Sequence, residues 1–484
     1  MKIYFTSILL ALILSQFAEI KAQELSSKDS VLKHMVLAND YFISKWPDPG
    51  ADIVTDRSRP SNLWTRAVYY EGLMALYFVS EDLSLYNYAV DWGESHDWKT
   101  TYGIPDSRDG DFQCCGQTYI ELYEISNNHD WIAPITENIN NMVDDDKNDD
   151  WSWVDAIQMS MPVFAKLGVV YSDTNYFNKM YKLYSYSKHQ HGENGLYSSE
   201  DHLWWRDGNF DPPETTPNGK KIYWSRGNGW VYAALVRVLS VIPEDETHRA
   251  EYIADFLDMT DALIAIQRED GFWNPSLVDP EDYGGKETSG TGFFVYGLAW
   301  GINNGYLDSA TYMPYVVAGW EGMVHDALHD NGFLGWVQGT GSAPEHGQPL
   351  SYDKPANFED YGLGAFLLAG SEVYKLAHES VNIPDALPST YQKSEDILLV
   401  YPSPGNSQIT ISYKLKNKSI TSLKILDSKG QIISSIENET LKTPGVYRLK
   451  WDPSQTDGSS LPKGIYLIKL TTDERICINK IVII

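Results

Sequence analysis

The sequence predicts an all-α domain with an (α/α)6 barrel fold at residues 23–380, a linker at 381–396 and a small β-sandwich at 397–484. Three observations support this prediction. From about residue 30 to residue 377, one segment after another places apolar side chains at helical spacing, without strong strand runs between them. No residue-level repeat of fixed period is present, which disfavours a solenoid. Beyond residue 397 the pattern changes to alternation of apolar and polar residues.

The helical spacing predicts twelve consecutive helices, which suits a closed toroid of six hairpins. Val231, Leu235 and Val238 form one clear apolar stripe, and Tyr361 and Ala365 begin another. The predicted helices are centred on residues 30–46, 62–79, 83–94, 115–126, 131–142, 153–167, 174–190, 228–240, 247–268, 290–304, 309–327 and 359–377.

Three connections between these helices are too long for simple turns, namely residues 98–113, 192–226 and 270–289. Loops of this length are usually functional or disordered. Tryptophans such as Trp204 and Trp273 argue against disorder. We therefore expect these loops to form the walls of a pocket.

The C-terminal segment alternates apolar and polar residues at 409–412, 423–425, 447–449 and 466–470. Turn residues such as Lys463-Gly464 separate the runs. This pattern predicts a small antiparallel β-sandwich without a dense site of its own.

The composition narrows the possible functions. The chain carries 66 Asp and Glu against 38 Lys and Arg, a net charge of −28, which argues against nucleic acid or an anionic membrane surface as partner. Aromatic residues make up 13% of the chain and suit sugar rings, although large helical cores also use them. The three cysteines are too few for a disulfide framework, and we expect the neighbours Cys114 and Cys115 to be buried thiols.

Residues 1–22 have the pattern of a secretory signal peptide. Lys2 supplies the charge, residues 8–14 form the apolar run, and cleavage before Gln23 is plausible. No later stretch is long and apolar enough to span a membrane. We therefore expect a secreted protein, extracellular or on the cell surface.

The strongest catalytic candidate is Asp155, in the run Trp151-Ser-Trp153-Val-Asp155 at the start of a predicted helix. The helix dipole favours its ionised form, whereas the indoles strip water from it, so the sequence leaves its protonation state open. A carboxyl group in this setting is a candidate general acid or base. The alternative is an aspartate that only stabilises the first helical turn beside core tryptophans.

A second candidate stretch, Trp224-Ser-Arg226-Gly-Asn-Gly-Trp230, opens another predicted helix. Arg226 offers a planar fork that can hold a carboxylate with two bonds. Trp224 and Trp230 can pack on a sugar face, and we predict all three to bind substrate. The alternative is a tight helix entry with packing tryptophans and a surface arginine.

Four further residues are weaker candidates. Asp111 precedes a helix and is either a second pocket carboxylate or a helix N-cap. Ser289, in the run at 287–294, offers a hydroxyl to polar ligand groups, although simple capping explains it almost as well. Asp201 and His202 lie in the 192–226 loop, where a histidine is more often a surface residue.

The sequence predicts neither metal nor cofactor. Asp144, Asp146, Asn148 and Asp150 have calcium-loop spacing, but Asp149 occupies the position that needs glycine, and no glutamate closes the loop. We interpret this segment as a solvated acidic loop. No nucleophile elbow, phosphate-binding loop or zinc-helix motif is present.

Several of these runs together resemble glycoside hydrolase family 105, the unsaturated rhamnogalacturonyl hydrolases. The likeness covers about residues 30–377 and is carried by Trp153-Val-Asp155, W-S-R-G-N-G-W at 224–230, E-T-S-G-T-G-F-F-V-Y-G-L-A-W-G-I-N-N-G at 287–305 and G-A-F-L-L-A-G at 364–370. The resemblance implies an (α/α)6 barrel that acts on oligosaccharides left by a polysaccharide lyase. The terminal 4,5-unsaturated uronic acid is protonated at C4, water adds at C5, and the hemiketal collapses without a metal or organic cofactor.

The resemblance also implies roles for individual residues. Asp155 is the general acid/base and Asp111 the second carboxylate, while substrate is bound by Trp153, Trp224, Arg226 and Trp230. The family's histidine in the 192–226 loop has no clean match, and Asp201 or His202 is its candidate replacement. The expected substrates carry a uronic acid linked to rhamnose, from ulvan or rhamnogalacturonan, which the motifs do not separate.

The C-terminal segment resembles the sorting domain of type IX secretion, with V-Y-P-S-P at 400–404 and K-G-I-Y at 463–466. That resemblance implies the type IX machinery as a partner in export. Two other functions compete with the hydrolase. A non-catalytic surface glycan-binding protein on the same scaffold is disfavoured by intact Asp155 and Arg226. Another toroid enzyme, such as a lyase or an epimerase, is not favoured by these motifs.

Overall fold

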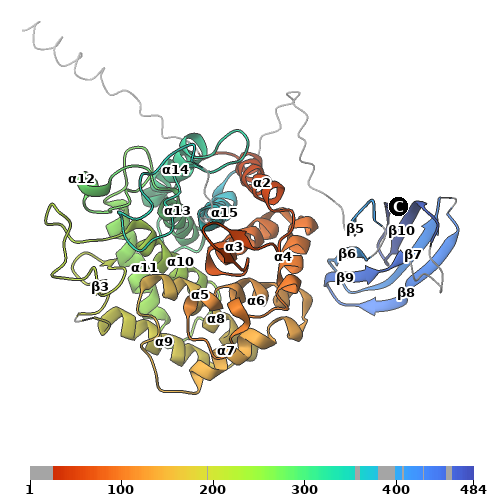
Figure 1. The fold of residues 1–484 in the computed structure, drawn as a ribbon, viewed down its shortest axis with the longest axis horizontal. Coiled ribbons are helices and arrows are strands. Elements are labelled where there is room, and N and C mark those ends of the chain that lie inside the picture. The colour runs from red at the N-terminus through yellow and green to blue at the C-terminus, as the bar shows by residue number, and fades with distance from the viewer. Residues whose placement is uncertain are drawn as a thin grey trace, which may run out of the picture.

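The computed structural model describes residues 25–192, 194–354, 360–379, 398–405, 408–428, 430–453 and 461–484. It has an (α/α)6 barrel followed by a small β-sandwich, which confirms the predicted fold class (Figure 1). The predicted signal peptide and linker, 1–22 and 381–396, lie outside the described residues, so these boundaries stay predictions. Within the described ranges, no helix has the length and apolar character needed to cross a membrane.

Six helices form a closed inner ring, in which each contacts the next and the last contacts the first. They are apolar on all sides because neighbours surround them. Every residue of α8 from Val154 to Gly168 is buried, and so is every residue of α10. In ring order the helices are α3 (Trp64–Ser80), α6 (Cys115–Ser126), α8 (Val154–Tyr171), α10 (Ser225–Leu239), α13 (Thr288–Asn303) and α15 (Asp360–Leu376).

Six outer helices alternate in sequence with the inner ones and bury one face only, as α2 does with Val31, Met35 and Phe42. They are α2 (Lys28–Lys45), α4 (Leu83–Ser95), α7 (Ala133–Val143), α9 (Thr174–His189), α11 (Arg249–Ile264) and α14 (Ser309–Asp326). All twelve predicted helices are therefore present. Because an outer helix returns the chain after each inner one, the N-terminal ends of the inner helices gather at one mouth of the barrel.

The inner helices α3 and α15 approach each other closely through glycines. A Cβ atom added at Gly364 would lie 2.3 Å from the carbonyl oxygen of Val68, and one at Gly72 would lie 2.6 Å from the carbonyl oxygen of Gly364. Backbone therefore packs directly on backbone at this point, where a larger side chain has no room.

The loops at the inner N-terminal mouth contain short elements that the periodicity did not predict. They are β1 (Ile53–Val54), β2 (Ser58–Arg59), η1 (Thr101–Gly103), α5 (Gly110–Gln113), β3 (Tyr197–Ser198), β4 (Leu203–Trp204) and α12 (Pro280–Tyr283). A further short element, η2 (His129–Trp131), lies between α6 and α7 at the opposite mouth. Isolated bridges join distant loops, such as Trp153 with Asp207 and Trp224 with Ser276. The long loops are thus held by backbone pairing.

The C-terminal domain consists of two antiparallel sheets, with strand orders β5-β6-β9 and β11-β10-β7-β8. The strands are β5 (Leu398–Tyr401), β6 (Ile409–Leu415), β7 (Ser419–Asp427), β8 (Ile432–Lys442), β9 (Gly445–Trp451), β10 (Gly464–Thr471) and β11 (Ile476–Ile483). Inward residues from both sheets, such as Ile411 and Ile468, share one core, as the alternation predicted. β6 contacts α4 and β9 contacts α6 (Figure 1). Across this contact, Lys450 donates to Glu94 at 2.8 Å.

Candidate active site

The first turns of the inner helices meet at one mouth of the barrel. Trp64 at the start of α3 stacks on Tyr361 of α15, with ring centroids 5.3 Å apart. Nε of Arg66 donates to Asp360 at 2.9 Å, which ties the same two helices together. Several helix N-termini therefore point to one region, where their partial positive charge favours anionic groups.

Asp155 lies in the first turn of α8 and is 5% exposed. Nε of Arg206 donates to its Oδ2 at 3.0 Å, and Nη1 of Arg206 donates to Asp207 at 2.7 Å. Backbone pairing sets this contact, because the N–H of Val154 donates to the carbonyl of Arg206 at 2.9 Å and Trp153 is bridged to Asp207. The guanidinium that faces Asp155 thus comes from the 192–226 loop.

Asp111 is the second carboxyl group at this place. A Cβ atom added at Gly110 would lie 3.1 Å from Cα of Ala156, so the backbone of α5 packs on the first turn of α8 and brings Asp111 beside Asp155. Burial, with smaller contributions from the charges of Asp109 and Asp155, raises the pKa of Asp111 to about 8 against the opposing charge of Arg206. At neutral pH Asp111 therefore carries a proton.

The helix-capping alternative for Asp111 does not apply. The N-cap of α5 is Asp109, whose side chain accepts from the backbone N–H of Asp111 at 2.9 Å. Among the described residues, the carboxyl group of Asp111 makes no hydrogen bond. Trp153, which is half-buried at the N-cap of α8, completes the cluster. The structure thus brings together Asp111, Trp153, Asp155 and Arg206.

Arg226 has no described contact with Asp155 and is not placed to bind substrate in this structure, contrary to our prediction. It is fully buried, with Nη1 and Nη2 donating to the carbonyl oxygens of Gln338 and Gly339, both at 2.8 Å. Its guanidinium lies between the rings of Trp224 and Tyr361, at 4.4 and 4.7 Å from their centroids. Arg226 therefore holds the loop after α14 against the barrel, and its terminal donors are already used.

Trp224, Trp230 and Ser289 are also buried and offer no face to a sugar. Nε1 of Trp224 donates to Oε1 of Gln338 at 2.8 Å. Trp230 packs on Phe293 with ring centroids 4.6 Å apart. The hydroxyl of Ser289 donates at 2.6 Å to Glu287, the N-cap of α13, so the capping interpretation fits this residue better than ligand binding.

Asp201 and His202 lie in the turn between β3 and β4, and neither has a described contact with Asp155. Asp201 accepts from Lys221 at 2.5 Å and from the hydroxyl of Tyr223 at 2.7 Å. His202 contacts the hydroxyl of Tyr197 at 3.0 Å and lies 3.6 Å from a carboxylate oxygen of Asp258. The loop reaches the candidate site four residues later, through Arg206.

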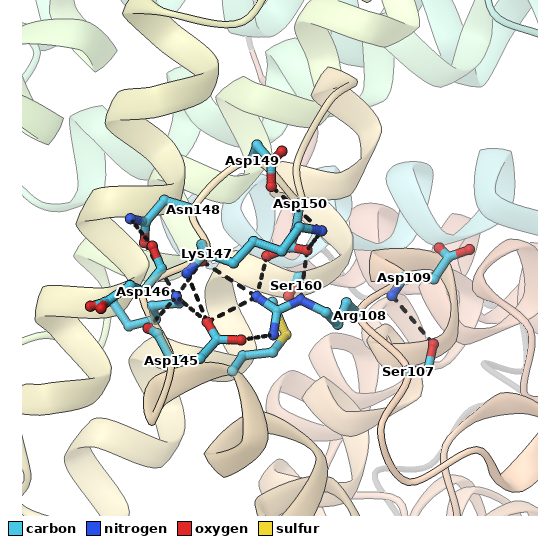
Figure 2. Close-up of polar contacts among 12 residues, drawn as sticks. Ser107, Arg108, Asp109, Asp145, Asp146, Lys147, Asn148, Asp149, Asp150 and Ser160 are labelled. Carbon is cyan, nitrogen blue, oxygen red and sulfur yellow. Dashed lines mark hydrogen bonds and ion pairs between the residues drawn. The ribbon is translucent and has the colours of Figure 1, made fainter.

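The acidic segment before α8 is largely exposed to solvent, as predicted, but Asp145 and the buried Asp150 are held in an ion-pair network (Figure 2). Arg108 donates to both carboxylate oxygens of Asp150, at 2.7 and 2.6 Å, and its Nη1 donates to Asp145 at 2.6 Å. Burial opposes the ionisation of Asp150, but hydrogen bonds from Arg108 and Lys147 outweigh it and lower its pKa. This network anchors the chain just before Trp151 and Asp155.

A second charged cluster lies toward the other end of the inner helices. Arg237 donates to Gln117 at 2.6 Å and to Glu121 at 2.8 Å, and Lys166 lies 3.1 Å from Glu121. Burial raises the pKa of Glu71 to about 7, against the opposing charge of Arg237. The opposite charges match within the cluster, so we assign it to holding α3, α6, α8 and α10 together.

Sequence reasoning missed Arg206, although a signal was available. The run Trp204-Trp-Arg206-Asp places an arginine after two tryptophans in a loop already expected to wall the pocket. The same argument singled out Arg226. That argument did not consider the loop between α14 and α15, in which the carbonyl oxygens of Gln338 and Gly339 accept hydrogen bonds from Arg226.

Curated relatives share sequence with this chain. A protein of Formosa agariphila named unsaturated 3S-rhamnoglycuronyl hydrolase is 41% identical over 231 residues, which cover 47% of this chain and 58% of that protein. A protein of the same name from Alteromonas sp. (strain LOR) is 30% identical over 339 residues, covering 66% of this chain and 78% of that protein. The Formosa match thus spans little more than half of that relative.

A solved structure titled glycosyl hydrolase family 88 from Bacteroides vulgatus has 33% identity and a TM-score of 0.66, and covers 72% of this chain and 99% of its own. The family model described as Glycosyl Hydrolase Family 88 matches residues 35–377, the part of the chain that carries the resemblance to family 105. Residues 399–484 match the secretion system C-terminal sorting domain, which marks a secreted or cell-surface protein. The chain therefore belongs to glycosyl hydrolase family 88 and carries a C-terminal sorting domain.

Proposed function

We propose that this chain is a glycosidase that removes a 4,5-unsaturated uronic acid from the non-reducing end of oligosaccharides made by a polysaccharide lyase. The observation that carries this proposal is the pair of carboxyl groups at the inner N-terminal mouth, with Asp155 held by Arg206 and Asp111 protonated at neutral pH. Membership of family 88 and the names of the curated relatives support the same reaction.

The reaction needs one group that donates a proton and later accepts one. Protonation of C4 leaves positive charge at C5, and the water that adds there must lose a proton. We assign both transfers to Asp155, with Asp111 as its partner. We propose that Asp155 and Asp111 share the proton that burial keeps on Asp111 at neutral pH. Asp155 gives that proton to C4 and recovers one from the attacking water, which leaves the pair unchanged.

The hemiketal that forms at C5 then opens and releases the rest of the oligosaccharide. No step of this reaction requires a covalent sugar–enzyme bond. The rule that relates the separation of two carboxylates to retention or inversion in ordinary glycosidases therefore does not apply. Trp153, the half-buried indole beside Asp155, is placed to cover one face of the sugar.

We propose a substrate in which the uronic acid is linked to rhamnose. The relatives named rhamnoglycuronyl hydrolases favour this class, and it includes fragments of ulvan and of rhamnogalacturonan. A panel of lyase digests from both polymers, with and without sulfate, separates these substrates. A lyase digest of a uronic-acid polymer without rhamnose completes the panel, and the substrate class is wrong if that digest alone is consumed.

The activity is tested by the ultraviolet absorbance of the conjugated double bond. Wild type should abolish this absorbance, and Asp155→Asn should lower kcat by about 10³-fold or more because the proton carrier is lost. A protein that only binds glycans would leave the absorbance unchanged, and a lyase would increase it.

Asp149→Asn is the matched control, because Asp149 is half exposed, pairs only with Lys147 among its described contacts and precedes the same helix. It should retain the wild-type rate. Thermal unfolding should show that both variants are folded. Near-normal turnover by Asp155→Asn would refute the acid/base assignment.

We also propose that the chain is exported through a signal peptide at 1–22 and the type IX machinery. The sorting domain at 399–484 supports this route. Deletion of 399–484 should leave the enzyme active but retained inside the outer membrane, as judged by activity in fractionated cells. Unchanged release would refute the role of this domain.

A further inference from the structure

Arg206 has one guanidinium nitrogen that no described residue occupies. Its Nε is taken by Asp155 and its Nη1 by Asp207, whereas Nη2 has no hydrogen bond within the described ranges. The side chain is 23% exposed, so a ligand in solvent can reach it. In Arg226, by contrast, both terminal nitrogens donate to backbone carbonyls and the side chain is fully buried.

We propose that Arg206 binds the carboxylate of the unsaturated uronic acid through Nη2 and so places the double bond beside Asp155. This inference rests on the proposed function. In a guanidinium, Nε and one terminal nitrogen form an edge whose spacing matches the two oxygens of a carboxylate. Oδ2 of Asp155 accepts a hydrogen bond from Nε of this edge. Nη2, the other nitrogen of the edge, is therefore open to a second carboxylate.

The chemistry of the substrate makes this position productive. The carboxylate of a 4,5-unsaturated uronic acid is attached directly to C5, and C4 is the next ring atom across the double bond. A carboxylate held at Arg206 therefore brings C4 and C5 to the guanidinium whose Nε is 3.0 Å from Oδ2 of Asp155. Orientation of this kind accounts for a large part of enzymatic rate acceleration.

The bound carboxylate would also change the charge balance around Asp155. In the free enzyme, Arg206 balances the carboxylates of Asp155 and Asp207. A substrate carboxylate adds a third negative charge and shares the guanidinium, and both effects favour the protonated form of a neighbouring carboxyl group. Binding of the correct substrate thus helps to load the proton that C4 receives.

Other cations of the same loops are already committed. Lys221 pairs with Glu200 and Asp201, at 2.7 and 2.5 Å. Arg108 is held by Asp145 and Asp150. Among the described cations, Arg206 is the one that forms an ion pair with Asp155.

The test combines a charge change on the enzyme with a charge change on the substrate. Wild type and Arg206→Gln are each assayed with an unsaturated uronyl disaccharide and with its methyl ester. If Arg206 binds the carboxylate, wild type should prefer the acid by roughly 100-fold in kcat/KM, as expected for a lost charged hydrogen bond. Arg206→Gln should lose a similar factor on the acid, so that its ratio of acid to ester activity falls by roughly 100-fold relative to wild type.

This design removes the intrinsic difference in reactivity between acid and ester, because that difference enters both enzymes equally. Arg206→Lys should recover part of the preference for the acid, since it restores the charge without the planar fork. Arg268→Gln is the matched control. Arg268 also pairs with an aspartate, Asp270, and its described contacts do not include the candidate site, so this variant should behave like wild type.

Two results would overturn the proposal. One is an Arg206→Gln variant that still prefers the acid as strongly as wild type does, because the carboxylate must then bind elsewhere. The other is a loss of kcat/KM in Arg206→Gln that occurs only with sulfated substrates, which would show that Arg206 binds a sulfate ester. Failure of the proposed function appears separately, as wild type without turnover on any substrate. In that case calorimetric binding of the acid and the ester to both proteins still decides the role of Arg206.

Discussion

The buried carboxyl group of Asp111 should make the stability of the barrel depend on pH. Its pKa is raised from 3.8 to about 8 by burial and by Asp109 and Asp155. Between pH 3.8 and about pH 8, Asp111 therefore keeps its proton in the folded chain but has lost it in the unfolded chain. Stability contributed by this group is fully present below about pH 4 and is lost as the pH rises through about 8.

The size of the effect follows from the shift. One pKa unit corresponds to about 1.4 kcal/mol, so the free energy of unfolding should fall by about 1.4 kcal/mol per pH unit across this window, and by about 6 kcal/mol in total. Near neutral pH the loss is about 4 kcal/mol. In Asp111→Asn, a neutral amide replaces the protonated acid, so this slope should disappear while kcat falls because the shared proton is gone.

Urea unfolding of wild type and Asp111→Asn at about pH 5, about pH 7 and about pH 9 measures the difference directly. The variant should gain stability over wild type as the pH rises. Asp106→Asn, which changes an exposed aspartate of the same loop, is the control and should follow wild type at every pH. Parallel curves for wild type and Asp111→Asn would show that Asp111 is ionised throughout, and the shared-proton argument would fail with it.

Two other predictions concern the scaffold. Gly364→Ala should lower the free energy of unfolding by about 1–3 kcal/mol, because the new Cβ lies 2.3 Å from the carbonyl oxygen of Val68 and must push α3 and α15 apart. Gly208→Ala, whose Cβ meets nothing closer than 3.7 Å, is the control in the same thermal melt, and equal melting temperatures would contradict the prediction. Lys188→Met should cost about 3–5 kcal/mol in urea unfolding, because it leaves the buried carboxylate of Asp255 without the ammonium that now bonds both its oxygens at 2.7 Å. An unchanged midpoint would mean that water reaches Asp255.

The architecture was largely predictable because its cause is local. An inner helix must be apolar on all sides and an outer helix on one, so the spacing along each segment revealed all twelve helices. The same applies to the alternation that marked β6, β7, β9 and β10. The helix start near Asp155 was also predictable, because the apolar residues at helical spacing begin there in the sequence. In the structure α8 begins at Val154, with Trp153 as its N-cap.

The partner of Asp155 depends on contacts between distant parts of the chain. Arg206 and Arg226 both follow tryptophans in the same long loop, and their neighbours along the chain do not show which of the two guanidinium groups is covered in the fold. Pairing of Trp153 with Asp207 sets Arg206 against Asp155, 51 residues away, whereas the loop after α14 surrounds Arg226 with carbonyls 112 and 113 residues away. Burial and hydrogen bonding between residues so far apart in the sequence depend on tertiary packing. The sequence pattern around each arginine therefore cannot predict which of the two guanidinium groups is buried.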